Sequence, residues 1–217
     1  MGANPKHIRK EIKEYLENIS DVNEPRIVFY CNNRGLYTKA YILINVGKKT
    51  SQTRSDDLEY QYSGGEYIVE LVIDKFPDKA PVLTLLTPNG RYESCKSVCL
   101  NGITHYHDGG WNFANNLHST LPQTLLSTMT DDSPEMKGIA YIKRTPEQRL
   151  KLASKSKEYN RENHMDIIKM FEEMEPEVLE AIEKNKKKKL DLVEETKKEE
   201  EDLLGEYGLE NLEDLRF

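Results

Sequence analysis

The chain has 217 residues, a formal net charge of −7 and three cysteines, a length that accommodates one domain of enzyme size plus additional material. The acidic balance argues weakly against a general nucleic-acid-binding protein, which needs a basic stripe to neutralise phosphates; the lysine run at 186–189 is typical of a solvated helix face. The few cysteines, the polar N-terminus and the lack of an apolar run of about 20 residues predict a cytoplasmic or nuclear protein without a membrane span.

The first part of the chain carries one helix signal and then four strand signals. Asn4 before Pro5 is a helix start, and the apolar residues that follow it recur at helical spacing as far as Leu16. Runs rich in β-branched and aromatic residues then occupy 26–31, 37–46, 66–74 and 82–86. Because short polar turns separate most of these runs, we expect a four-stranded antiparallel meander.

After the strands, the pattern changes to an irregular segment and then to helices. Residues 87–116 are rich in Asn, Gly, His and Ser and show no period, and a long irregular segment inside a compact domain is usually functional. Helical patterns follow at 119–129, 145–159, 165–174 and 176–204. The last of these is densely charged, with scattered apolar residues, and predicts a helix that either docks an apolar stripe or frays. We therefore expect a domain over 1–160 and a charged helical extension over 161–217.

Short motifs stand in a fixed order within this framework. They are Tyr62-Ser63-Gly64-Gly65, Phe76-Pro77-Asp78-Lys79-Ala80-Pro81, Thr87-Pro88-Asn89-Gly90-Arg91-Tyr92, and Val98-Cys99-Leu100 followed by Trp111. In this order and spacing they resemble the ubiquitin-conjugating enzyme family, and most of all its J-type branch, in which the family's His-Pro-Asn tripeptide is replaced by Thr-Pro-Asn. The resemblance covers about residues 6–160 and implies an α+β ubiquitin-conjugating fold.

The resemblance implies that Cys99 accepts the C-terminal glycine of ubiquitin as a thioester. A thiolate suits this chemistry because it is both a good nucleophile and a good leaving group. Without the surrounding motifs, Cys99 would be interpreted as a small buried apolar residue, which is the usual role of a free cysteine. The resemblance implies that Asn89 stabilises the oxyanion or holds the loop in which the reaction occurs. Without the motif, Asn89 would be interpreted as an ordinary turn residue before Gly90.

Two further residues are candidates for helping the acceptor attack. His107 precedes Trp111 near a position where J-type relatives also have a histidine, and a base with a pKa near 7 would assist attack by a serine or threonine hydroxyl. Asp132, which we slightly prefer to Asp131, stands where many relatives place an acidic residue that orients the incoming lysine. The simpler alternatives are a loop histidine bonded to backbone and a pair of aspartates in a turn.

The resemblance also implies partners. The basic residues Arg9, Lys10 and Lys13 of the first helix match the contact with the ubiquitin-activating enzyme, although a merely solvated face explains them equally well. Trp111 and Phe113, with the 76–81 turn, match the contact with a ubiquitin ligase whose identity is unknown. We expect no bound cofactor and no metal, because ATP would be used by the activating enzyme.

Two other functions compete with the enzyme. The first is a non-catalytic binding module on the same scaffold; such variants lack the cysteine, so Cys99 argues against it. The second is a scaffold that acts through the C-terminal helices by forming a coiled coil or recruiting another protein. Within the enzyme hypothesis, the modifier is ubiquitin or a ubiquitin-like protein, and both lysine and hydroxyl acceptors remain open.

Overall fold

A computed structural model describes residues 3–20, 26–31, 37–49, 54, 56–100, 102–106, 110–112, 114–130 and 139–207, with side chains to residue 199. The elements are α1 (Pro5–Asn18), β1 (Arg26–Cys31), β2 (Lys39–Asn45), α2 (Leu58–Gln61), β3 (Glu66–Val72), β4 (Val82–Leu85), α3 (Thr120–Thr130), α4 (Pro146–Ala153), α5 (Ser156–Asn163) and α6 (Met165–Tyr207). The N-terminal helix, four consecutive strands and C-terminal helices confirm the predicted fold class.

The first helix begins where the sequence predicts. The side chain of Asn4 accepts a hydrogen bond from the N–H of Lys6 at 3.0 Å, and Pro5 occupies the first turn. The buried side chains of α1 include an apolar pair, Ile8 and Tyr15, and one carboxylate, Glu11. The apolar pair holds α1 against the core, and Glu11 joins α1 to the segment before α3.

The sheet is a simple antiparallel meander with strand order β1-β2-β3-β4. The register pairs Phe29 with Ile42 across β1 and β2, and Ile42 with Val69 across β2 and β3. In β2, the consecutive residues Ile42, Leu43 and Ile44 are all buried, although neighbouring side chains of a strand point to opposite faces. Both faces of the sheet are therefore covered.

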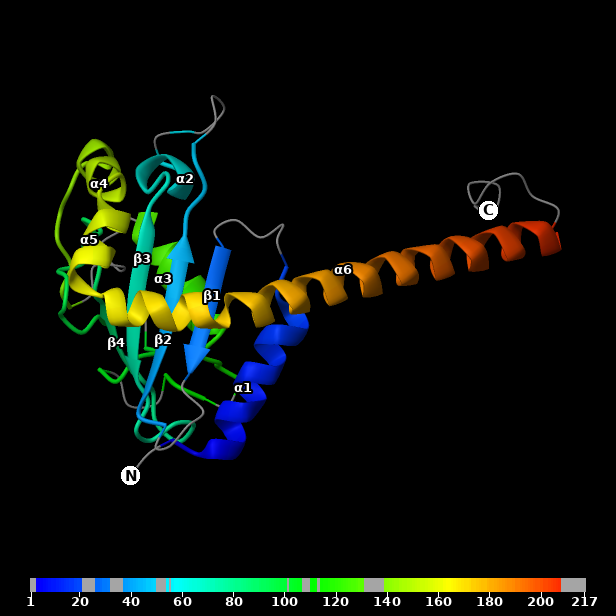
Figure 1. Cartoon of the computed structure of the whole chain (residues 1–217), viewed down its shortest axis with the longest axis horizontal. Helices are drawn as coiled ribbons and strands as arrows, with labels where there is room; N and C mark the ends of the chain where they lie inside the picture. The colour runs from blue at the N-terminus through cyan, green and yellow to red at the C-terminus, as the bar shows by residue number, and fades with distance from the viewer. Residues whose placement is uncertain are drawn as a thin grey trace.

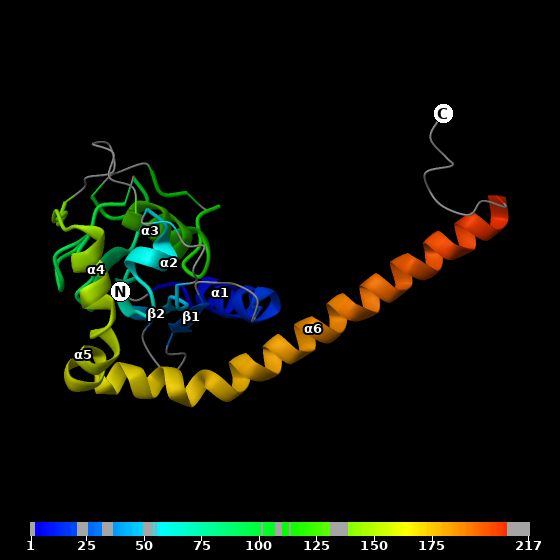
Figure 2. The same cartoon turned by 90° about the horizontal axis from the view of Figure 1, so that it is seen from above.

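Two groups of helices supply this cover. In Figure 1, α6 crosses in front of the strands and α3 lies behind them, and Figure 2 shows the sheet between α3 on one side and α5–α6 on the other. The helix α1 packs against β1 and also contacts α6. The core thus has two layers, one on each face of the sheet.

The helix α6 has a docked half and a projecting half (Figures 1 and 2). In the docked half, Phe171, Val178 and Ile182 are buried, and Asn185 donates to the backbone oxygens of Leu16 at 3.0 Å and Ile19 at 2.9 Å. Beyond this point the described apolar side chains are exposed: Leu190, Leu192 and Val193. The docked half therefore packs with the body, and the projecting half leaves it.

The predicted break at Pro176 was wrong, because α6 continues through this residue. Proline removes one helical hydrogen bond and crowds the preceding turn. Buried Phe171 and Val178 hold the helix on both sides of Pro176, and Arg26 pairs with Glu175 at 2.8 Å. Tertiary packing therefore outweighs the local preference for a break.

Other boundaries also differ from the prediction. The helix expected over 145–159 is divided into α4 and α5 around Ser154–Lys155. A short helix, α2, lies between the second and third strand runs, where no helix was predicted. Among the helices in the described part of the chain, none has the length and apolar character needed to cross a membrane.

Candidate active site

Cys99 lies on a segment that the core holds on both sides. Val98 and Leu100 are fully buried, whereas Cys99 is partly exposed. The N–H of Val98 donates to the carbonyl of Leu83 at 2.8 Å, which fastens the segment alongside β4. The sulfur is therefore fixed in position and still accessible, as a reacting thiol must be.

The loop after Cys99 closes back on itself. The N–H of Leu100 donates to the hydroxyl of Thr104 at 3.1 Å, and the N–H of Ile103 donates to the carbonyl of Leu100 at 2.8 Å. The hydroxyl of Tyr106 also contacts that of Ser97, on the other side of Cys99. These hydrogen bonds connect residues of the loop to one another and to the segment that precedes Cys99.

The pKa of Cys99 is raised above that of an ordinary thiol, because burial disfavours the thiolate. Hydrogen bonds from the N–H groups of Gly102 and Ile139 and from the hydroxyl of Thr104 lower the pKa, but burial outweighs them. The resting group is therefore mostly a thiol at neutral pH.

Asn89 has a very different environment. Its side chain is fully buried, and its oxygen accepts hydrogen bonds from the N–H groups of Arg91 and Tyr92, both at 2.8 Å. Its nitrogen donates to the carbonyls of Thr87 at 3.2 Å and Tyr92 at 3.3 Å. The amide is fully engaged with its own loop, so the geometry favours the loop-holding role over the oxyanion role.

Thr87, at the position of the family's histidine, connects the loop to α5. Its hydroxyl accepts a hydrogen bond from the N–H of Ile68 at 2.9 Å and donates to the side-chain oxygen of Asn160 at 2.6 Å. The side-chain nitrogen of Asn160 in turn bonds to the backbone and side-chain oxygens of Glu66, both at 3.1 Å. The Thr-Pro-Asn loop is thereby held to both the sheet and the C-terminal helices.

A second segment reaches Cys99 by pairing with the end of this loop. The N–H of Glu93 donates to the carbonyl of Ala140 at 2.8 Å, and the N–H of Ile142 donates to that of Arg91 at 2.9 Å. The guanidinium carbon of buried Arg91 lies 4.6 Å from the centre of the Tyr141 ring. These contacts hold the segment that carries Ile139.

Three predicted residues, His107, Asp132 and Phe113, lie outside the described residues, as does Asp131. Their roles remain predictions. The neighbouring His105 is described: its ring centre lies 4.0 Å from that of Tyr106, and partial burial lowers its pKa. It is the described histidine closest in sequence to Cys99.

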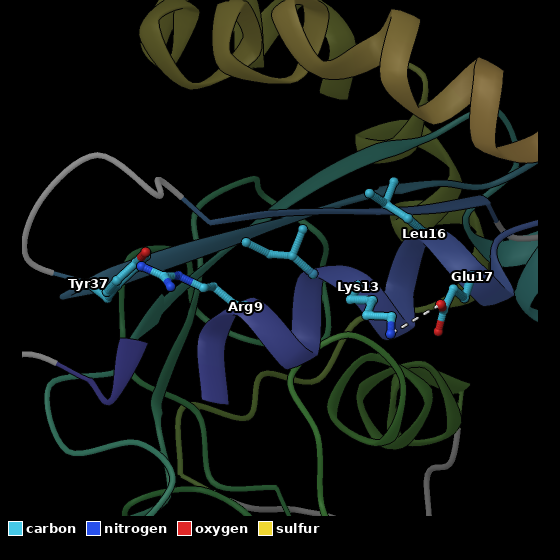
Figure 3. A pocket seen from close by; sticks show the side chains of 6 residues that line it. Arg9, Lys13, Leu16, Glu17 and Tyr37 are labelled. Carbon is cyan, nitrogen blue, oxygen red and sulfur yellow. Dashed lines mark ion pairs between the residues drawn. The ribbon is translucent and has the colours of Figure 1, made fainter. Parts of the chain in front are cut away.

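The predicted activating-enzyme residues lie on two sides of α1. Arg9 and Lys13 line a groove of about 600 Å³ with Leu16 and Tyr37 (Figure 3). Arg9 extends toward Tyr37, and Lys13 forms an exposed ion pair with Glu17 at 3.7 Å. Lys10 lines a different cleft, between α1 and the Phe76-Pro77 turn.

The second cleft joins α1 to the predicted ligase-contact segments. It lies between α1, the Phe76-Pro77 turn and residues 114–116. The indole of Trp111 fastens this turn by donating to the carbonyl of Pro77 at 2.9 Å and packing edge-on against Phe76 with 6.0 Å between ring centres. Trp111 thus has a clear structural role, whatever partner the cleft binds.

The remaining chemistry-bearing residues form no second centre in the described part of the chain. Cys95 is exposed and Cys31 is buried, and both are free thiols. Within that part, no group of three His, Cys, Asp or Glu side chains is arranged to hold a metal ion. Sequence reasoning missed Thr104, Gly102 and Ile139, and no motif marks them, because folding alone brings them to the sulfur.

No family model matches the chain. It is similar to the mouse ubiquitin-conjugating enzyme E2 J2, with 36% identity over 120 residues, which is 55% of this chain and 42% of that enzyme. It is also similar to ubiquitin-conjugating enzyme E2 6 of Candida glabrata, with 28% identity over 176 residues, 81% of this chain and 62% of that enzyme. A Dictyostelium discoideum protein named as E2 J2-like is 34% identical over 103 residues, 47% of this chain and 58% of that protein.

The chain spans 42% of the length of the mouse, cow and human E2 J2 enzymes that it matches. The matched names agree with the motifs read from the sequence, and the helix-meander-helix order agrees with the fold that those motifs imply. These findings confirm that the chain has the ubiquitin-conjugating fold, and they show that it is similar to ubiquitin-conjugating enzymes, the E2 J2 enzymes among them.

Proposed function

We propose that this chain is a ubiquitin-conjugating enzyme that carries ubiquitin as a thioester on Cys99. The observation that carries the proposal is the placement of this thiol, which is partly exposed and lies between two fully buried neighbours. A merely structural cysteine would be expected to be buried in apolar surroundings, as a small apolar side chain is. The names of the relatives support the same reaction class.

The proposed reaction has two group transfers through the same sulfur. In loading, the thiolate of Cys99 attacks the C-terminal acyl carbon of ubiquitin bound to the activating enzyme, and that enzyme's cysteine leaves as a thiolate. In discharge, an acceptor nitrogen or oxygen attacks the acyl carbon, the carbon–sulfur bond breaks, and Cys99 leaves as a thiolate while the acceptor loses a proton. Neither transfer needs a metal or bound cofactor, because ATP is consumed by the activating enzyme.

Asn89 supports the reaction by holding the loop beside it. Its four hydrogen bonds fix residues 87–92, and the end of that loop in turn positions the segment carrying Ile139. A donor already bonded to two carbonyls would have to break these bonds to reach an oxyanion. We therefore infer that Asn89 acts on the reaction mainly through its loop.

In this proposal, His107 and Asp132 determine which kind of acceptor receives ubiquitin. His107 would accept the proton of a serine or threonine hydroxyl, and Asp132 would orient an incoming lysine. To test this, loaded enzyme is offered free lysine, serine and threonine. The His107→Gln variant should lose hydroxyl discharge and keep lysine discharge, and the Asp132→Asn variant should do the reverse; unchanged discharge in both variants would remove these roles.

The two clefts beside α1 suit two different partners. The groove is lined by Arg9, Lys13 and Glu17 beside apolar surface; two cations against one carboxylate leave an excess of positive charge, which supports the contact with an acidic face of the activating enzyme. The cleft with the Phe76-Pro77 turn supports the ligase contact. Charge reversal of Arg9 and Lys13 should slow loading and leave discharge of a preloaded thioester unchanged.

A direct experiment tests the proposed activity. The chain is incubated with activating enzyme, ATP and ubiquitin and resolved on gels with and without reducing agent. The proposal expects a thiol-sensitive adduct that Cys99→Ala abolishes and Cys95→Ser retains. An adduct that survives Cys99→Ala, or no adduct from folded protein, would refute it; a ubiquitin-like modifier is tested in the same assay.

A scaffold function through α6 is the second candidate. It is favoured by the exposed Leu190, Leu192 and Val193 on the projecting half, beside a block of exposed lysines at 186–189. Truncation after Lys186 retains the docked half, including Asn185, and is therefore preferable to truncation at residue 160. Loading should survive this truncation, whereas recruitment of another protein through the helix should not.

A further inference from the structure

The C-terminal end of α1 lacks the local features that commonly complete a helix. The last four carbonyl groups of a helix have no partner within it, and a glycine just beyond the end or a basic side chain in the last turn often compensates. Here Ile19 and Ser20 follow the helix, and its last turn contains no basic side chain. Partners for these carbonyls therefore have to come from outside the helix.

One side chain of α6 supplies such a partner. The side-chain nitrogen of Asn185 donates to the carbonyls of Leu16 at 3.0 Å and Ile19 at 2.9 Å. An amide nitrogen carries two hydrogens, so both bonds form at once. Asn185 is partly buried, and Ile182, one turn earlier on α6, is buried. A residue from the C-terminal extension thus caps the first helix of the chain.

A second contact fastens α6 beyond the end of α1, at the start of β1. Arg26, the first residue of β1, pairs with Glu175 of α6 at 2.8 Å. Between Glu175 and Asn185, the side chains of Val178 and Ile182 are buried. In Figure 1, α6 accordingly passes across β1 and then beside the end of α1, both of which it contacts. The docked half of α6 thus holds the end of one element and the start of the next.

The last turn of α1 is also a wall of the groove that carries Arg9 and Lys13. Leu16, whose carbonyl bonds to Asn185, lines this groove with its side chain, next to Glu17 (Figure 3). Lys13 and Glu17 form an exposed ion pair at 3.7 Å, and such pairs add little stability. The position of this wall therefore depends on how the end of α1 is anchored.

We propose that Asn185 is a positioning residue that fixes the end of α1, and with it the groove that binds the activating enzyme. None of the described residues that line this groove belongs to α6, so the helix acts on it only through α1. The role in binding rests on the proposed function. The fastening of α1 is a property of the folded chain and can be measured without ubiquitin.

Three variants of the full chain test the proposal. Asn185→Asp keeps the shape of the side chain, removes both donor hydrogens and places a carboxylate against two carbonyl oxygens. Asn185→Ala removes the bonds without adding a charge, so it separates their loss from repulsion. Asn163→Asp is the matched control, because Asn163 makes the same kind of bond, to the carbonyl of Tyr159 at 2.9 Å, within α5.

Hydrogen exchange of backbone amides, resolved by peptide, measures the fastening. In both Asn185 variants, exchange over residues 15–19 should accelerate by about threefold to tenfold, as expected for the loss of one or two partly buried hydrogen bonds. Exchange over residues 5–11 should not change, since the start of α1 has its own cap. Asn163→Asp should alter neither segment.

Initial rates of loading, measured over a range of concentrations of the chain, test the role in binding. The Asn185 variants should show a KM raised by about threefold to tenfold and an unchanged kcat, because the groove is disturbed while Cys99 is not. Discharge of a preloaded thioester should match that of the parent. Far-UV circular dichroism should show the variants as fully folded as the parent, which excludes a smaller active fraction as the cause of the higher KM.

Unchanged exchange over residues 15–19 in both Asn185 variants would overturn the proposal, as would an acceleration that extends over the whole sheet or occurs equally in Asn163→Asp. Faster exchange with an unchanged KM would overturn the positioning role and leave the proposed function standing. If the parent chain forms no thioester, the proposed function fails, and the exchange measurement alone decides whether Asn185 holds α1.

Discussion

Asn89 and Cys99 are ten positions apart and show opposite solutions to placing a polar group. Asn89 is fully buried and makes four hydrogen bonds within its loop, whereas Cys99 is partly exposed between two fully buried neighbours. A fully bonded amide stabilises the shape of its loop, whereas a partly exposed thiol remains accessible to a reacting group. In the proposed enzyme, Asn89 therefore builds the site and Cys99 reacts.

The largest effect on stability is expected from substitution of Asn89. Asn89→Ala removes four hydrogen bonds and leaves buried backbone groups without partners, so the free energy of unfolding should fall by about 2–4 kcal/mol. Urea unfolding measures the loss. Ubiquitin discharge should fall with it; normal stability with strongly reduced discharge would instead favour a direct role for the amide at the oxyanion.

The next effect is the pH dependence of Cys99. Burial raises its pKa, so the thiolate fraction grows about tenfold for each pH unit until the pH passes that raised value. Alkylation of Cys99 should therefore reach its midpoint at a higher pH than that of free glutathione measured alongside. A midpoint below that of glutathione would mean that the donors outweigh burial.

A smaller effect tests how the loop of Asn89 is held to α5. Thr87→Val removes the hydroxyl that bridges Ile68 and Asn160, and should lower the free energy of unfolding by about 1–3 kcal/mol. Thr87→Ser should restore most of it, as thermal unfolding can show. If the valine variant and the parent are equally stable, this buried network makes no net contribution to the free energy of unfolding.

The smallest effect is expected at Cys99 itself. Cys99→Ser should change the free energy of unfolding by less than about 0.5 kcal/mol, because the side chain is partly exposed and its size is nearly preserved. The same substitution should convert any ubiquitin adduct from a thioester to an oxygen ester that resists thiol reagents. A large loss of stability would show that Cys99 is mainly structural.

The sequence predicted the parts of the fold that depend on local pattern. The start of α1 follows from Asn4 and Pro5, and the strands follow from β-rich runs separated by turns; β1 matches its predicted bounds. Cys99 could be singled out because it stands at a fixed spacing from the Thr-Pro-Asn motif. These signals lie close together in the chain, where a periodic pattern or a motif can reveal them.

The features that the sequence did not predict depend on distant contacts. The bond of Thr87 to Asn160 and the approach of Ile139 to Cys99 join segments far apart in the chain. The continuity of α6 through Pro176 likewise depends on packing against the sheet and α1, which overrides the local tendency to break. Such features emerge only when the core is assembled.

The most direct test of the central claim is intact-mass spectrometry of the chain after loading under non-reducing conditions, with the adduct located by peptide mapping. The account predicts one added ubiquitin, less one water, on the peptide containing Cys99, removed by thiol reagents and absent from Cys99→Ala. An adduct on Cys95 or on a lysine alone, with Cys99 unmodified in correctly folded protein, would contradict it.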